Sequence, residues 1–324
     1  GAGARSALGG ALSAASRWEE AIPHLTAALR ASGEDPKLRL ALAVAEQNAE
    51  SWENALQDVD RAIAGGAGGA VTWNVRGVAL AGLWRLEEAM VEFGRAVEAA
   101  PDDPGPLLNR ATTRIDAGLL DGAAEDLAAV ERIFPEHPML AYLRAKLALE
   151  AGRPAEALIQ VDRSLTDAGL QPAGLELRSR VLIALDRLPE ALESCTRALD
   201  SGSTSGAIRL RLLRARIHLQ LGDEAAALQD ATEYLLKEPD SEAGHQVRAE
   251  AFQRLGRQDD AVRDLAFVTH ASHENWSAWL DLGDCEAAQG RPEAAFRAWR
   301  RGLEAAPAEA RAEFETRIRK AGGR

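Results

Sequence analysis

The chain has 324 residues, 46% of them hydrophobic and 27% charged, and its 50 acidic against 38 basic side chains give a formal net charge of −12. This acidic balance disfavours general nucleic-acid binding, which depends on a net positive surface. No stretch approaches ~20 consecutive apolar residues, so direct membrane insertion is not expected either.

Taken in chain order, the sequence is a series of paired amphipathic segments separated by short polar turns. Residues 70–103 show the pattern best. Their second half carries an apolar stripe at steps of three and four residues, formed by Leu86, Ala89, Met90, Phe93, Ala96 and Val97. Glu87 and Glu88 fall in the first turn of this segment, where the helix dipole favours negative charge. The spacing predicts two helices, the second of which ends at Pro101.

The same pattern recurs along the chain in steps of 34 residues, with a single step of 36. One column of the repeat holds only small residues: Gly9, Ala43, Gly77, Ala111, Ala145, Ser179, Ala215, Ala249 and Gly283. Twelve residues after each of these comes an alanine: Ala21, Ala55, Ala89, Ala123, Ala157, Ala191, Ala227, Ala261 and Ala295. Two columns restricted to small residues predict helices whose backbones cross closely there, since larger side chains would clash.

These columns resemble the tetratricopeptide (TPR) repeat family. The family's Trp–Gly–Ala–Phe–Ala–Pro pattern is matched by Trp73, Gly77, Ala89, Phe93, Ala96 and Pro101. The resemblance covers residues 2 to about 309 and implies an all-α fold: a right-handed α-solenoid of nine helix-turn-helix units plus a C-terminal capping helix. The units run at approximately 2–35, 36–69, 70–103, 104–137, 138–171, 172–207, 208–241, 242–275 and 276–309, and the capping helix and tail at 310–324.

The ends and joints of the array differ from its middle. Phe314 and Ile318 face inward on an otherwise polar last helix, as an end cap requires. The first unit has no such cover, so we expect self-association through this uncapped end. Gly1 stands at a unit boundary, which suggests a trimmed chain with leader or neighbouring domains removed. The Ser/Gly-rich residues 200–206 predict a loosened joint, and the lack of a basic-then-apolar opening segment favours a cytoplasmic location.

One polar column departs from the family pattern. Arginine precedes the small residue in six units, at Arg76, Arg110, Arg144, Arg178, Arg214 and Arg248, and sixteen residues later stand Glu92, Asp126, Gln160, Ser194, Asp230 and Asp264. We predict four partly buried Arg–carboxylate pairs, termed latch pairs: Arg76–Glu92, Arg110–Asp126, Arg214–Asp230 and Arg248–Asp264. Such pairs fix helix register more surely than they add stability. An anion-binding site is the alternative interpretation.

A second column suggests a binding surface, because the resemblance implies that the first helices of the units line a concave groove. The position directly after the small residue is basic in three successive units. Three positions further on, four successive units have an aliphatic residue. The predicted partner-binding residues are the basic Lys146, Arg180 and Arg216, the aliphatic Ile115, Leu149, Ile183 and Leu219, and the nearby Arg209, Asn109 and Tyr142. A cationic row beside an apolar row suits a peptide with carboxylates and apolar anchors. In the alternative, Asp116, Glu150 and Glu176 neutralise the row and the aliphatic residues pack between units.

No spacing in the sequence predicts a catalytic triad, a carboxylate dyad or a metal site. His270 and His273 form the only histidine cluster and lack further ligands, and Cys195 and Cys285 fit neither a metal spacing nor a disulfide framework. We therefore expect no enzyme activity and no cofactor. The favoured hypothesis is a protein–protein interaction scaffold or adaptor that binds a peptide or partner segment in the groove. The alternative is a regulatory or substrate-recruiting arm of a larger multidomain enzyme or complex.

Overall fold

The computed structural model describes residues 1–33, 35–201 and 206–322. Within these residues the chain forms α-helices and one 3-10 turn and no strand, so the predicted all-α fold is confirmed. The chain divides into two compact units, Gly1–Leu170 (unit 1) and Gln171–Arg324 (unit 2), which are described one at a time. A loosened joint was predicted at residues 200–206, and residues 202–205 of this stretch lie outside the described residues.

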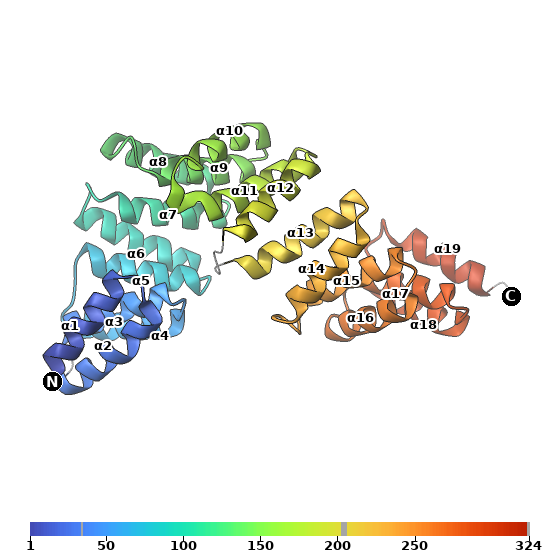
Figure 1. Cartoon of the computed structure of the whole chain (residues 1–324), viewed down its shortest axis with the longest axis horizontal. Coiled ribbons are helices and arrows are strands. Elements are labelled where there is room, and N and C mark those ends of the chain that lie inside the picture. The colour runs from blue at the N-terminus through green and yellow to red at the C-terminus, as the bar shows by residue number, and fades with distance from the viewer. Residues whose placement is uncertain (34, 202–205, 323–324) are drawn as a thin grey trace. The chain divides into compact units, whose positions relative to one another are not determined.

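Unit 1 is a stack of antiparallel helical hairpins in which each helix packs against the helices before and after it in the chain (Figure 1). Its elements are α1 (Ala2–Ala14), α2 (Trp18–Ser32), α3 (Pro36–Asn48), α4 (Trp52–Ala64), α5 (Ala70–Gly82), α6 (Leu86–Ala99), α7 (Pro104–Asp116), α8 (Leu120–Ile133), α9 (Met139–Glu150), α10 (Pro154–Ser164) and the 3-10 turn Ala168–Leu170.

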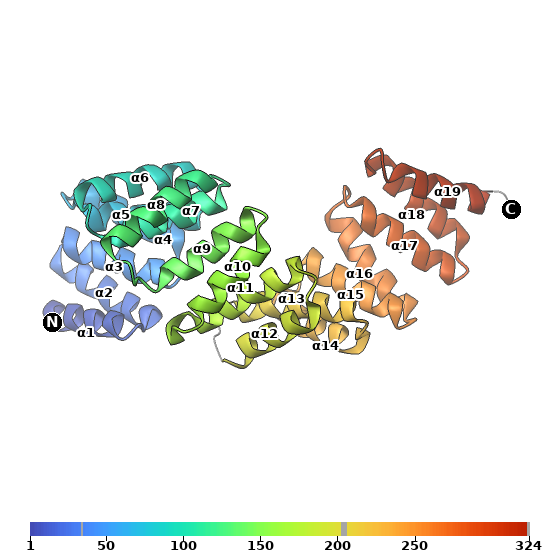
Figure 2. The same cartoon turned by 90° about the horizontal axis from the view of Figure 1, so that it is seen from above.

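Unit 2 continues the pattern and adds one further helix at its C-terminal end (Figure 2). Its elements are α11 (Gln171–Ala184), α12 (Leu188–Asp200), α13 (Ala207–Leu221), α14 (Glu224–Leu235), α15 (Glu242–Arg254), α16 (Gln258–Ala271), α17 (Trp276–Ala288), α18 (Pro292–Ala305) and α19 (Arg311–Gly322). The apolar residues of both units form several clusters along the stack rather than one central core, as expected of a repeat protein.

Local chemistry at the helix starts explains where the hairpins begin. The side chains of Asp35 and Asp103 accept hydrogen bonds of 2.9 Å from the backbone amides of Lys37 and Gly105. These bonds satisfy amides that have no partner within the helix. A proline opens α3, α7, α10 and α18, at a position where the missing N–H has no consequence.

The two small columns lie where the helices of each hairpin cross. All nine alanines of the second column are completely buried. In the first column, an added Cβ on Gly77 would come within 2.6 Å of the Phe93 ring, and one on Gly283 within 2.3 Å of Trp299. The helices therefore touch at these positions, and the prediction made from the small columns is confirmed.

The turn inside each hairpin contains one residue in the left-handed region of backbone space. The residue is glycine in five hairpins and not glycine in four, at Ser16, Glu50, Trp84 and Asp186. A side chain in this conformation costs about 1 kcal/mol relative to glycine. Trp84 is the extreme case, with φ +58° and an exposed fraction of 75%, so this turn holds strain that burial does not offset.

Helix α19 closes the C-terminal end of unit 2. Phe314 is completely buried, and an added Cβ on Gly302 would lie 2.3 Å from its ring. Arg317 donates hydrogen bonds of 2.7 and 2.8 Å to the two carboxylate oxygens of Asp284 on α17. The polar last helix thus packs through Phe314 and Ile318, the inward positions predicted from the sequence.

Candidate partner-binding surfaces

The latch pairs join the two helices of single hairpins. In three of them the guanidinium donates two hydrogen bonds to one carboxylate, with distances of 2.7 and 3.0 Å for Arg110–Asp126, 2.7 Å for both bonds of Arg214–Asp230, and 2.7 Å for both bonds of Arg248–Asp264. These carboxylates are at most 4% exposed. Hydrogen bonds to Asp230 and Asp264 raise the pKa of Arg214 and Arg248, and hydrogen bonds between charged groups are stronger than those between neutral groups.

The remaining positions of the latch column vary. Arg76 donates single hydrogen bonds to Glu92 at 2.8 Å and to Asp60 at 2.7 Å. Arg178 donates to the Ser194 hydroxyl at 2.6 Å. Arg144, the one arginine opposite a glutamine, donates to Glu131 of α8 at 2.6 Å instead of bonding within its own hairpin. In the six hairpins that have an arginine in this column, the residue opposite decides where the arginine bonds.

Sequence reasoning missed a further buried bridge in the hairpin α3–α4. Arg39 donates to Asp58 at 2.5 Å, and the two residues are 4% and 8% exposed. Asp58 occupies the carboxylate column, whereas Arg39 lies one turn before the arginine column, where this hairpin has Leu42. A search of the column allowing a shift of one helical turn would have found the pair.

The same hairpin contains a second carboxyl group beside the bridge. Glu46 is 7% exposed, and its Oε2 atom has no hydrogen-bond partner among the described residues. Burial, with the neighbouring charge of Asp58, raises the pKa of Glu46 to about 8. Because burial and the charge of Asp58 both disfavour the ionised form, Glu46 holds a proton at neutral pH.

The predicted groove residues of unit 1 are largely engaged with one another. The Lys146 ammonium forms an ion pair of 2.6 Å with Asp116, and Asn109 donates to Asn74 of α5 at 2.9 Å. Tyr142 and Leu149 are half-buried on α9. Asp116 therefore neutralises Lys146, as the alternative interpretation of the row anticipated.

The predicted residues of unit 2 differ, because three cationic side chains are exposed there: Arg180 on α11, and Arg209 and Arg216 on α13. Arg209 and Arg216 are seven residues apart and so share one face of α13. Neither forms an ion pair or hydrogen bond with any residue that the structure describes. Ile183 is half-buried nearby on α11.

Two of the predicted apolar anchors are corrected by the structure. Ile115 and Leu219 are each 3% exposed and belong to the cores of their own hairpins. Leu149 and Ile183 occupy the same position of their units and are half-buried, so the packing of each hairpin, and not the position alone, buries Ile115 and Leu219. These two side chains are therefore not available to a ligand in a groove.

An acidic group on α15 and α17 adjoins the cap. Asp281 lies near Glu250 and Asp284, and burial together with these negative charges raises the pKa of Asp281 to about 6. Asp284 is also the acceptor of Arg317 and of the Trp299 indole N–H at 3.0 Å. Asp284 thus serves partly to fix helix α19.

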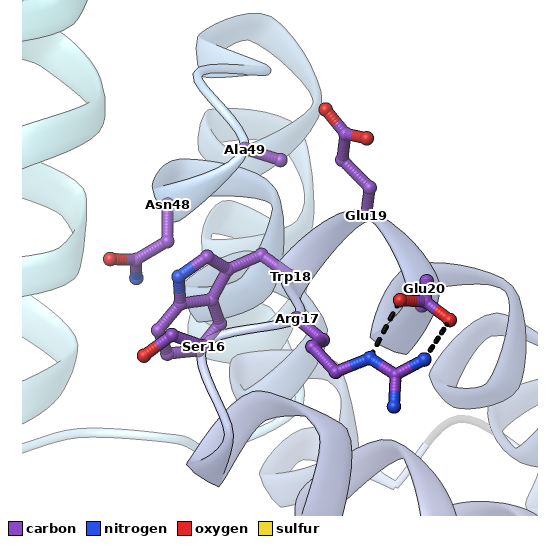
Figure 3. Close-up of a pocket in the computed structure, with 7 residues that line it drawn as sticks. All are labelled: Ser16, Arg17, Trp18, Glu19, Glu20, Asn48 and Ala49. Carbon is purple, nitrogen blue, oxygen red and sulfur yellow. Dashed lines mark hydrogen bonds and ion pairs between the residues drawn. The ribbon is translucent and has the colours of Figure 1, made fainter. Parts of the chain in front are cut away.

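A small hollow lies at the turns of the first two hairpins (Figure 3). It has a volume of about 230 Å³ and is lined by Ser16, Arg17, Trp18, Glu19, Glu20, Asn48 and Ala49. The Arg17 guanidinium points to Glu20 and donates two hydrogen bonds to it, of 2.7 and 2.5 Å. This bonding raises the pKa of Arg17 and lowers that of Glu20, so the only cation lining the hollow is already engaged.

A larger cavity of about 510 Å³, called the unit 2 cavity, lies among α16, α17 and α18. It is lined by Ala266, Thr269, His270, His273, Trp279, Leu282, Glu286, Ala294, Arg297, Ala298 and Arg301. His270 and His273, noted in the sequence only as a histidine cluster without further ligands, are exposed and border this cavity. No periodic pattern in the sequence indicates the cavity, because three helices contribute to it. No group of three potential metal ligands occurs in the described part of the chain.

The two thiols have surroundings unlike those of reactive cysteines. Cys195 and Cys285 are free and buried. Burial raises the pKa of Cys195 to about 12 and also raises that of Cys285. Reactive cysteines are partly exposed and have a lowered pKa, so these two side chains act as small core residues.

The stacked hairpins define an α-solenoid built from a helix-turn-helix repeat. The tetratricopeptide repeat model matches residues 6–70, 108–172, 176–243 and 247–314, which together make up most of the chain. The chain therefore belongs to the tetratricopeptide repeat family. Membership supports a role as a protein-interaction scaffold rather than as a catalyst. None of the helices in the described residues is long and apolar enough to cross a membrane.

The chain is similar in sequence to one protein and in structure to two others. Protein FlbA of Caulobacter vibrioides is 30% identical over 158 residues, which cover 44% of this chain and 26% of FlbA. The chain thus spans about a quarter of that relative. Human IFIT1, solved as a dimer with m7Gppp-AAAA, has a TM-score of 0.62 at 14% identity, covering 99% of this chain and 81% of its own. A tetratricopeptide repeat protein of Parabacteroides merdae has a TM-score of 0.51 at 17% identity, covering 78% and 98%. These two structures share the fold alone.

Proposed function

We propose that the chain is an adaptor whose first helices bind a peptide or partner segment, and that α11 and α13 of unit 2 supply the cationic part of this surface. The observation that carries the proposal is the pair Arg209 and Arg216, exposed on one face of α13 and without a partner in the described residues. An unpaired arginine keeps all its donors available to a carboxylate. Lys146 contributes less to the binding of a partner, because it already forms an ion pair with Asp116.

The chemistry of this surface defines the partner. Exposed arginines favour a segment rich in Asp or Glu, and the half-buried Ile183 offers an apolar contact on α11. With Ile115 and Leu219 buried, the surface provides fewer apolar anchors than the sequence predicted. Electrostatic complementarity therefore dominates recognition, so binding should weaken as salt is raised.

The test is a double charge reversal, Arg209→Glu with Arg216→Glu. The matched control is Arg300→Glu with Arg319→Glu, which gives the same change in net charge at exposed positions on α18 and α19. Both variants and the unmodified chain are used to capture proteins from a lysate of the native cells, and captured proteins are identified by mass spectrometry. We expect a specific partner to be lost only from the Arg209/Arg216 variant. Equal capture by this variant and the unmodified chain would refute the proposal.

The alternative function, an arm of a larger enzyme or complex, is favoured by one observation. The matched relative FlbA is much longer than the region it shares with this chain. The size of the native gene product tests this alternative, since an arm requires a longer product with a catalytic domain. Self-association through α1 is a separate prediction, which sedimentation at two protein concentrations tests.

A further inference from the structure

The unit 2 cavity combines an apolar floor with cationic walls. Leu282 and Ala298 are 9% and 4% exposed and form part of the α16–α17–α18 core, against which Trp279 also packs. Trp279 and Leu282 are three residues apart on α17 and lie toward the cavity together. A volume of about 510 Å³ falls within the range of sites that hold a small ligand or a few side chains.

The aromatic wall of this cavity is held in position before any ligand arrives. The Trp279 indole N–H donates to the carbonyl oxygen of His273 at 3.1 Å. His273 Nδ1 contacts the carbonyl oxygen of Thr269 at 2.8 Å, which ties the segment after α16 back to that helix. A ring fixed by such contacts loses little freedom on binding, and preorganisation of this kind favours affinity.

The charges of the walls are not balanced within the cavity. Arg297 and Arg301, one turn apart on α18, are exposed and have no hydrogen bond or ion pair with a residue in the described ranges. Glu286, the only acidic residue of the lining, forms an ion pair with Arg291. Two guanidinium groups therefore face the cavity with no carboxylate left to neutralise them.

We propose that the unit 2 cavity, among α16, α17 and α18, is a second docking site for a short acidic segment of a partner protein. One aromatic or aliphatic side chain of the segment lies on Trp279 and Leu282, and carboxylates beside it pair with Arg297 and Arg301. The apolar floor favours a peptide over a nucleic-acid strand, because a phosphate backbone would satisfy the arginines and leave the floor uncovered. The site is independent of the surface on α11 and α13.

The proposal is tested with three short probes on the purified chain. The first is the tripeptide acetyl-Glu-Phe-Asp-amide, the second its neutral analogue acetyl-Gln-Phe-Asn-amide, and the third acetyl-Glu-Ala-Asp-amide, which lacks the anchor. Binding is followed through the indole N–H signal of Trp279 in nitrogen-15 NMR spectra, identified by its loss in Trp279→Phe. We expect the first probe to shift this signal and to bind at least about tenfold more tightly than either analogue.

Three double variants distinguish binding at the unit 2 cavity from binding at the surface on α11 and α13. Arg297→Glu with Arg301→Glu should weaken the first probe at least about tenfold, whereas Arg300→Glu with Arg319→Glu, and Arg209→Glu with Arg216→Glu, should leave its affinity unchanged. Circular dichroism melting shows that each variant is folded. The proposal is overturned if the Trp279 signal does not move, if the neutral analogue binds equally well, or if a uridine tetranucleotide displaces the peptide at equal concentration.

Discussion

The hairpins α7–α8 and α9–α10 of unit 1 share their packing and differ in their polar bridge. In both, the two small positions at the crossing are completely buried alanines: Ala111 and Ala123 in one, Ala145 and Ala157 in the other. The first hairpin adds the two-bond pair Arg110–Asp126. The second lacks such a pair, because Arg144 bonds to α8 instead, yet its helices pack closely. Close backbone approach is therefore sufficient to form the hairpin, and the bridge is an addition.

The largest effect is expected from enlarging the shared alanines. Ala123→Leu and Ala157→Leu should each destabilise the chain by about 3 kcal/mol, because the extra carbons have no space at a crossing. Urea unfolding followed by circular dichroism measures the loss. The exposed neighbours Ala124 and Ala155 serve as controls, and their leucine variants should change stability little. A tolerated Ala157→Leu would show that the two hairpins do not depend on the same packing.

The bridge itself should give a smaller effect that is not additive. Asp126→Leu leaves the guanidinium groups of Arg110 and Arg114 without their carboxylate, and should cost about 3 kcal/mol, while Arg110→Met should cost about 2 kcal/mol. The double variant should lose clearly less than the sum, which a double-mutant cycle measures. In the other hairpin, Arg144→Met removes an exposed pair and should change stability little. Simple additivity at Arg110 and Asp126 would refute the latch.

The hairpin α3–α4 extends the comparison to a bridge with a surplus carboxyl group. The pKa of Glu46 is about 8 in the folded chain, against an ordinary 4.5. Between these values the folded state holds a proton that the unfolded state has released, so stability falls as pH rises from about 4.5 to about 8. Glu46→Gln removes this dependence and should stabilise the chain by about 2 kcal/mol at pH 9 and little at pH 5. Thermal melts at both pH values check this, and an equal gain at both would contradict the protonation argument.

The smallest expected effects concern the turns. Gly118 and Gly152 have φ of +73° and +70°, and an added Cβ meets nothing within 4 Å at either. Gly118→Ala and Gly152→Ala should therefore each lose about 1 kcal/mol from backbone strain alone, equally with and without a bridge. Trp84→Gly should gain a similar amount. Thermal shifts of the three variants test this, and a loss in Trp84→Gly would mean that the exposed indole has contacts of its own.

Much of the fold was predictable because its signal is geometric and repeated. A column of small residues has one physical meaning in a helical hairpin, and nine copies remove the ambiguity of a single one. The Arg–carboxylate column was visible for the same reason. The pair Arg39–Asp58 was not predicted, because Arg39 lies one helical turn before the arginine column while Asp58 lies in the carboxylate column. A search for residues at fixed spacing does not find such a pair.

The binding surfaces were harder to predict, because exposure is decided by packing between helices. Ile115 and Leu219 were placed in the groove from their column, whose other members Leu149 and Ile183 are half-buried, so the column alone did not show that these two belong to the core. Lys146 and Arg216 occupy the same column, yet only Lys146 meets a carboxylate. The unit 2 cavity draws on three helices, so no single periodic pattern contains it.

The division of the apolar residues into clusters along each unit has a kinetic consequence. Helices pack mainly against their neighbours in the chain, so little of the native contact map requires distant segments to meet. Such low contact order favours rapid folding, and folding is free to nucleate in any adjacent pair of hairpins and then spread.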